Sequence, residues 1–260
     1  MEYESIIFER DGGVAIITLN RPQAVNALTY RLIEEFLDAL ARIAEDETVR
    51  AVVITGAGRG FCSGDSLTGM EPVTMDLPPG RHPMQERQQR LIKTLRGLPK
   101  PVIAMINGHC YGAGSDIALA SDFRIAGESA RLGDIRTSRA ITLSTGAPYL
   151  LPQIVGVAKA VELLFTGDTM DAREAERIGL VNKTVPDAEL RAATMQLANR
   201  LAQGPTKAIG IAKTLIYGEQ HMNLEQALDH QYAYRWMTVR DGEEGRKSFI
   251  EKRQPHFTGH

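Results

Sequence analysis

Hydrophobic residues in the first half of the chain alternate between short β-branched runs and helically spaced stretches. Residues 14–20 (VAIITLN) predict a strand. The continuous runs AVVITG at 51–56 and VIAMING at 102–108 are typical of strands buried on both faces. Hydrophobic positions over 32–43 recur at the i, i+3, i+4 spacing of an amphipathic helix. The pattern predicts an α/β core.

Helical periodicity takes over further along the chain. Residues 85–98 predict a helix, and SDFRIA at 121–126 predicts one more short strand. From about Val157 onward only helical spacing is expected, over 158–165, 172–178, 186–202, 205–217, 224–239 and 243–253. The stretch from Gly69 to Arg81 is rich in Pro and Met and predicts a loop. We therefore expect a strand-and-helix core followed by a helical C-terminal third.

The composition is that of an ordinary folded domain. Of 260 residues, 43% are hydrophobic, and 30 Lys and Arg nearly balance 32 Asp and Glu, so the formal net charge is −2. This balance argues against nucleic acid as a partner. No apolar run reaches the ~18 residues of a membrane span, and the acidic N-terminus is unlike a secretory signal. We expect a cytoplasmic protein without a membrane partner.

Residues that support metal or redox chemistry are sparse, and several common motifs fail. Cys62 and Cys110 are too few for a disulfide framework, and the six histidines stand singly, so no metal site is expected. In GAGRGF at 56–61 a phenylalanine replaces the last glycine of the dinucleotide-binding motif. The sequence has no GxxxxGK[ST] or HExxH, and Ser144 lacks the first glycine of a nucleophile elbow.

Two glycine-rich turns, each following a buried strand, remain as candidate chemistry. They are FCSGDSL at 61–67 and NGHCYGAGSD at 107–116. Glycines leave main-chain amides uncovered, and a helix that starts after the second turn adds its positive end. Two such turns side by side can direct two amides at one oxygen, which stabilises an oxyanion. From spacing alone, turns that merely connect strands to helices remain the alternative.

At these turns the chain resembles the enoyl-CoA hydratase/isomerase family, also called the crotonase superfamily. Six ordered segments carry the resemblance, at 19–28, 51–64, 100–108, 163–167, 175–182 and 249–253. It implies a spiral of βββα-type turns over residues 1–200 and a helical trimerisation region over 201–260. It also implies an acyl-CoA thioester substrate without a permanently bound cofactor, and a homotrimer or a dimer of trimers.

The resemblance also assigns binding residues. The two oxyanion donors correspond to the backbone amides of Asp65 and Ala113. Val25 and Ala27 correspond to backbone positions along the coenzyme, together with Ser63, Gly64 and Asp65 of the first turn. Phe249 and Lys252 match C-terminal positions that reach coenzyme A bound to a neighbouring subunit.

The chain departs from the family at the two glutamates with which its hydratases activate water. Asp116 stands at the first position and Arg136 at the second. A guanidinium cannot accept a proton, which argues against two-carboxylate hydration. Asp116 can act alone as base or acid, with Arg136 tuning it or binding a substrate carboxylate. The Asp65 side chain, where ordinary members carry a small residue, is another candidate.

A structural interpretation of these residues also stays open. Asp116 can be a buried polar group paired with Arg136, and Asp134 can equally be the partner of Arg136. We expect an acyl-CoA hydratase or isomerase that acts through a thioester enolate. The alternatives are a non-catalytic acyl-CoA binding protein, and a thioesterase or decarboxylase in which Arg136 recognises a second carboxylate.

Overall fold

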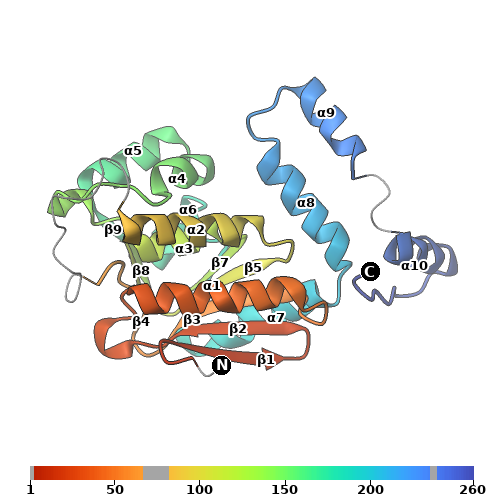
Figure 1. Cartoon of the computed structure of the whole chain (residues 1–260), viewed down its shortest axis with the longest axis horizontal. Coiled ribbons are helices and arrows are strands. Elements are labelled where there is room, and N and C mark those ends of the chain that lie inside the picture. Colours follow the sequence, from red (N-terminus) through yellow and green to blue (C-terminus); the bar gives the residue numbers. More distant parts are fainter. Residues whose placement is uncertain (1–2, 67–81, 235–238) are drawn as a thin grey trace.

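The hydrophobic runs of the sequence form strands in two sheets. The computed structural model describes residues 3–66, 82–234 and 239–260. The larger sheet has the order β1-β2-β3-β5-β7-β10, and the smaller sheet β4-β6-β8-β9 (Figure 1). Their bounds are β1 Ile6–Asp11, β2 Val14–Leu19, β3 Ala51–Gly56, β4 Gly60–Cys62, β5 Val102–Ile106, β6 His109–Tyr111, β7 Phe123–Gly127, β8 Arg131–Gly133, β9 Thr169–Asp171 and β10 Lys183–Val185. The β1–β2 and β8–β9 pairs are antiparallel, and the other pairs are parallel.

Three successive repeats of the chain, which are the turns of a spiral, build both sheets together. Each turn places one strand in the larger sheet and the next in the smaller sheet, as β3 then β4, β5 then β6, and β7 then β8. The ends of corresponding strands in consecutive repeats of the spiral therefore lie beside one another. This stacking brings the segments that follow β4 and β6 together, although about 50 residues of sequence separate them.

Helices cover both faces of the larger sheet. In β2, Ala15 and Ile17 face one hydrophobic cluster with α1, α2 and α3, whereas Val14 and Ile16 face a second cluster with α7. Such two-sided burial explains the continuous apolar runs. The helices are α1 Tyr30–Glu45, α2 Pro83–Gly97, α3 Ala113–Ala120, α4 Ala147–Val155, α5 Val157–Thr166, α6 Ala172–Arg177, α7 Leu190–Ala202, α8 Thr206–Gly218, α9 Leu224–Tyr232 and α10 Val239–Glu251.

The three C-terminal helices extend away from the sheets (Figure 1). A buried ion pair fastens α8 to the core, because Lys213 Nζ lies 2.9 Å from Asp122 Oδ2, and Tyr217 donates a hydrogen bond to the same carboxylate. Arg50 donates to the backbone oxygens of Gly204 and Phe257, which ties the C-terminal segment to the start of β3. Within the described residues, no helix is both long enough and apolar enough to span a membrane.

The mixed α/β class and the longer elements agree with the sequence prediction. The expectation of purely helical structure after Val157 is wrong, because β9 and β10 lie in that region. The helix expected over 224–239 ends at Tyr232, and α4 was not expected. The predicted loop from Gly69 to Arg81 lies outside the described residues.

Glycines allow the β4 and β6 turns to approach each other closely. A Cβ on Gly114 would stand 2.7 Å from the Cβ of Cys62 and would also overlap its carbonyl group. Gly64 has a φ of +96°, a conformation that side-chain-bearing residues rarely adopt. The contact between α3 and the end of β4 therefore depends on residues without side chains.

We expect Gly114→Ala to lower the free energy of unfolding by about 1–3 kcal/mol, because backbone at Cys62 must move. Urea denaturation at pH 7 measures the change. Gly97→Ala is the matched control, since no atom stands within 4 Å of the added methyl, and it should be neutral or stabilising by up to about 1 kcal/mol. An unchanged denaturation midpoint for Gly114→Ala contradicts the close approach.

Candidate active site

The two glycine turns identified in the sequence lie against each other. Cys62 and Cys110 are registered partners on neighbouring parallel strands, so the turns begin at the same level. A Cβ on Gly64 would stand 3.4 Å from the amide nitrogen of Ala113 and 3.7 Å from the Cα of Gly112. The structure therefore brings the turn that follows β4 and the turn that follows β6 into contact, at Gly64 and Ala113.

The amides of Asp65 and Ala113 border this contact. Leu28 donates to the oxygen of Gly64 and accepts from the amide of Ser66, so the amide of Asp65 between them points away from Leu28. Ala113 is the first residue of α3, where amides have no partner within the helix. No hydrogen bond between described residues uses either amide.

The residues predicted to lie along the coenzyme form one strip beside the first turn. Ser63 donates its amide to the oxygen of Val25, and its hydroxyl donates to Ala24. Val25 and Asn26 have positive φ, and the Asn26 side chain supports this bend by donating to the oxygens of Ala57 and Gly60. Val25, Ala27, Ser63, Gly64 and Asp65 are therefore neighbours.

Phe249 and Lys252 are not brought to this region within one chain. Phe249 lies in α10 and Lys252 directly follows that helix, which lies at the far side of the molecule from β4 (Figure 1). The Phe249 side chain is 85% exposed. A role for these residues would thus require a neighbouring subunit.

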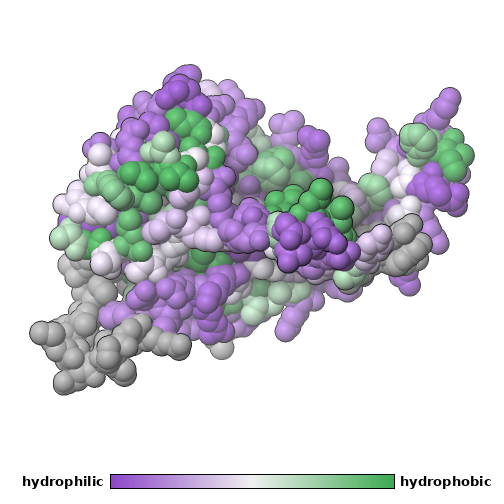
Figure 2. Space-filling view, turned by 90° about the horizontal axis from the view of Figure 1, so that it is seen from above, coloured by the Kyte–Doolittle hydropathy of each residue, from purple (hydrophilic) through white to green (hydrophobic). Residues whose placement is uncertain are grey.

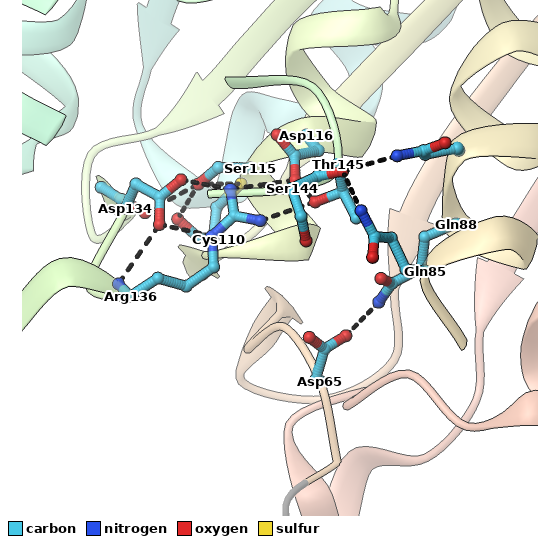
Figure 3. A network of polar contacts seen from close by, with 12 residues as sticks. Asp65, Gln85, Gln88, Cys110, Ser115, Asp116, Asp134, Arg136, Ser144 and Thr145 are labelled. Carbon is cyan, nitrogen blue, oxygen red and sulfur yellow. Dashed lines mark hydrogen bonds and ion pairs between the residues drawn. The ribbon is translucent and has the colours of Figure 1, made fainter. Parts of the chain in front are cut away.

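A buried polar network surrounds Asp116 on α3 (Figure 3). Arg136 Nη2 lies 3.0 Å from Asp116 Oδ2, and Thr145 donates a hydrogen bond to the same oxygen. Arg136 Nη1 in turn donates to Thr145 Oγ1 at 2.6 Å. The other carboxyl oxygen, Asp116 Oδ1, is buried and has no hydrogen-bond partner within the described residues.

Arg136 binds both candidate partners, and Asp134 binds it more fully. Its Nε donates to Asp134 Oδ1 at 2.8 Å, and its Nη2 contacts Asp134 Oδ2. Burial disfavours the charged guanidinium, but the two carboxylates outweigh burial and raise the pKa of Arg136. Because its donors are engaged by Asp134, Asp116 and Thr145, Arg136 functions here as an internal counterion.

Burial also controls the protonation of Asp116. The side chain is enclosed, and burial raises the pKa of Asp116 to about 6, although the positive charge of Arg136 and the hydrogen bond from Thr145 oppose the shift. A carboxyl that changes charge close to neutral pH is suited to general acid–base chemistry. Arg136 and Thr145 both contact Oδ2, which leaves Oδ1 outside the ion network.

Helix α2 contributes groups that the sequence analysis missed. Gln88 donates a hydrogen bond to Asp65 Oδ1, and Gln85 and Gln89 donate to the backbone oxygen of Ser144, next to Thr145 (Figure 3). Gln88 occupies the buried stripe of α2 that also contains Met84, Leu91 and Leu95. The sequence signal that could have identified Gln88 is a polar residue at a position where the helical spacing predicts burial, because buried polar groups usually have a hydrogen-bond partner.

The site offers no evident metal site. Within residues 3–66, 82–234 and 239–260, no group of three or more His, Cys, Asp or Glu side chains has an arrangement that could hold an ion. The polar groups that the structure describes at this site are two main-chain amides, the buried carboxyls and one paired guanidinium.

Comparisons with known proteins agree with this architecture. The family described as Enoyl-CoA hydratase/isomerase matches residues 9–260. The chain is 34% identical to 1,2-epoxyphenylacetyl-CoA isomerase of Escherichia coli, over 98% of this chain and 99% of the relative. It is also 34% identical to short-chain-enoyl-CoA hydratase of Clostridium acetobutylicum, over 98% and 97%. The crystal structure of enoyl-CoA hydratase from Bacillus anthracis superposes with a TM-score of 0.91 at 34% identity, covering 99% of this chain and all of the other.

The chain therefore belongs to the enoyl-CoA hydratase/isomerase family, as its sequence motifs predicted. Its fold is that of the crotonase superfamily with a helical C-terminal region.

Arg136→Met should lower the free energy of unfolding by about 3–5 kcal/mol at pH 7, because it leaves two buried carboxyls without their cation. The loss should be smaller at pH 5. Without Arg136 the folded state holds the Asp116 proton more tightly than the unfolded chain does, so acid relieves the penalty. Urea denaturation at both pH values measures this effect.

Arg173→Met is the matched control, because Arg173 forms an exposed ion pair with Glu128 and should contribute at most about 1 kcal/mol. Equal, pH-independent losses for the two variants would show that the buried network does not depend on the charge of Arg136.

Proposed function

We propose that this enzyme binds an acyl-CoA thioester and polarises its carbonyl between the amides of Asp65 and Ala113, so that an enolate can form. The observation that supports the proposal is the contact of the two glycine turns, in which Gly64, the neighbour of Asp65, meets the amide of Ala113, while no hydrogen bond between described residues uses the amide of Asp65 or of Ala113. Each amide that stabilises an oxyanion typically lowers the barrier by ~2.7–4 kcal/mol.

The strip formed by Val25 and Ala27 is the proposed binding surface for coenzyme A, with Ser63 and Gly64 beside it. Its support is the fixed backbone bend next to the proposed oxyanion amides, which would place the thioester between the two turns. Phe249 and Lys252 would reach the nucleotide end of coenzyme A bound to another subunit. No permanently bound cofactor is required by this scheme.

Asp116 is the proposed proton carrier. In an isomerisation its carboxylate would take a proton from C2 of a 3-enoyl thioester and return one at C4, with the enolate charge held at the amides. The buried, unpartnered Oδ1 and the pKa near 6 support this role. Isomerase-type chemistry needs only one carboxyl, and it therefore fits better than two-carboxylate hydration. The second position holds Arg136, which cannot accept a proton and is already paired with Asp134.

The alternatives have less support. The relatives are named as hydratases and an isomerase, which does not favour a non-catalytic acyl-CoA carrier. Recognition of a substrate carboxylate by Arg136, as a decarboxylase or thioesterase would need, would have to displace Asp134 or Asp116.

An oligomer is the proposed working form, either a trimer or a dimer of trimers. Figure 2 shows hydrophobic patches on the surface seen from above. Exposed hydrophobic side chains recur four residues apart on α5, at Val157, Val161 and Phe165, and on α9, at Leu224, Leu228 and Tyr232. Such helix faces are typical of subunit contacts. A cytoplasmic location also stays a prediction.

Asp116→Asn should reduce turnover of a 3-enoyl-CoA by about 100-fold or more, because the amide cannot carry the proton. Product formation with crotonyl-CoA and with a 3-enoyl-CoA measures the two reactions, and calorimetry should show nearly unchanged acyl-CoA affinity. Asp168→Asn, which alters an exposed carboxyl, is the control. Full activity of Asp116→Asn in both assays removes Asp116 from the mechanism.

The pH dependence gives a second test of Asp116. A base with a pKa near 6 is ionised above that pH and protonated below it, so kcat/KM should fall about tenfold per pH unit below pH 6. The Asp168→Asn control should keep the same acidic limb. A profile that stays flat down to pH 4.5 contradicts the assignment.

A further inference from the structure

The hydroxyl of Thr145 joins Arg136 to Asp116 (Figure 3). Arg136 Nη1 lies 2.6 Å from Thr145 Oγ1, and Thr145 Oγ1 is hydrogen-bonded to Asp116 Oδ2. Thr145 is 4% exposed, so water does not compete for these contacts. We propose that Thr145 is a positioning residue, which fixes the carboxyl of Asp116 and confines its proton to Oδ1. The inference rests on the proposed function, because it concerns the orientation of the base proposed there.

The chemistry of the groups sets the direction of both hydrogen bonds. A guanidinium has donors only and stays charged, so Arg136 can only donate to Oγ1. The threonine hydroxyl has a single hydrogen, and within the described part of the chain its other hydrogen-bond partner is Asp116 Oδ2. If that hydrogen pointed elsewhere, it would be buried without an acceptor, which is costly. Thr145 therefore donates to the carboxyl.

The two oxygens of Asp116 consequently differ. Oδ2 accepts from two donors, because Arg136 Nη2 lies 3.0 Å from it in addition to the hydroxyl of Thr145. A proton on Oδ2 would face both of these hydrogens. Oδ1 is buried and has no hydrogen-bond partner among the described residues, so a proton there meets no competing donor. The proton that Asp116 takes up thus resides on Oδ1.

The main chain around Thr145 is held by two helices. Gln85 and Gln89 of α2 both donate to the backbone oxygen of Ser144, which directly precedes Thr145. Gly146, on the other side, is the N-cap of α4. The position of the hydroxyl is therefore set by the packing of α2 and α4, independently of the carboxyl that it contacts.

The elements packed against α3 otherwise present uncharged groups to this carboxyl. The thiols of Cys62 on β4 and Cys110 on β6 are buried, and burial raises the pKa of both, so they stay neutral. Strand β5 is apolar, and the buried residues of α2 carry no charge. Helix α4 contributes the backbone amide of Ala147. The charges that act on the carboxyl are those of Arg136 and Asp134.

Donation from Thr145 favours the ionised form of Asp116, because a hydrogen-bond donor stabilises a carboxylate. Burial raises the pKa of Asp116 to about 6, and Arg136 and Thr145 act against that rise, whereas Asp134 adds to it. Removing the hydroxyl therefore raises the pKa of Asp116 further. The acidic limb of kcat/KM, which reports ionisation of the base, then moves to higher pH.

Thr145→Val tests the inference, since valine has nearly the shape of threonine but no donor. We expect the acidic limb of kcat/KM on a 3-enoyl-CoA to move up by about one pH unit. Above that limb kcat should fall about tenfold, because the carboxyl is less firmly oriented, while KM stays within about threefold. Thr145→Ser keeps a hydroxyl and should restore the wild-type limb. A merely structural role would lower stability and leave the limb in place.

The surface of the molecule offers a matched control with the same three residue types. Arg10 Nη2 donates to Thr48 Oγ1 at 2.8 Å, and that hydroxyl donates to Asp46 Oδ1, but these contacts are exposed to solvent. Thr48→Val removes an equivalent hydroxyl away from the site. It should keep the wild-type kcat, KM and pH profile.

Infrared spectroscopy provides a readout that does not need turnover. The carboxylic acid band of protonated Asp116 is the one that Asp116→Asn lacks. With the proton on Oδ1, the carbonyl oxygen is Oδ2, so two donors should hold this band at low frequency in the wild-type protein. The band should rise in Thr145→Val and stay low in Thr145→Ser. If Thr145→Val folds poorly, the wild-type band alone decides, because a frequency typical of a carbonyl without hydrogen bonds contradicts the inference.

The outcomes separate this inference from the proposed function. An unmoved acidic limb and wild-type kcat in folded Thr145→Val overturn the inference alone when Asp116→Asn is inactive. An equal shift of the limb in Thr48→Val overturns it as well. Full activity of Asp116→Asn removes the base itself, and with it both the proposed role of Asp116 and the positioning role of Thr145.

Discussion

The contact between two glycine turns is the constraint on which the rest of the site depends. The backbone after β4 and the start of α3 can meet because Gly64, Gly112 and Gly114 present no side chains at the contact. The same approach brings Gly64, the neighbour of Asp65, against the first amide of α3, and Asp116 lies one helical turn further along that helix. A local steric condition therefore positions both the two main-chain amides and the Asp116 carboxyl.

The second condition for the site is that its buried charges compensate one another within the protein. Asp134 and Asp116 surround the buried Arg136 with negative charge. A buried ion network of this kind costs desolvation and is tolerated when its members satisfy one another. The network opposes the effect of burial on Asp116 but does not cancel it, since burial still raises the pKa of Asp116 to about 6.

Long, strongly patterned elements were predictable from the sequence, whereas short ones were not. Residues 51–56 form β3 as expected, and the amphipathic run of 32–43 forms most of α1. The strands β9 and β10 were missed because each has three residues, too few for a period of two to appear. Pairing with strands already in place, rather than local propensity, creates such short strands.

The sequence by itself determined the family, the two glycine turns and the residue types at Asp65, Asp116 and Arg136, because glycine-rich turns and helical spacing are local properties of the chain. Only the tertiary structure decided which partners these side chains have. It gave Arg136 to Asp134 as well as to Asp116, and it brought Gln88 from α2 to Asp65. Those partnerships depend on how a helix and a loop pack in three dimensions, and no spacing along one chain encodes that packing directly.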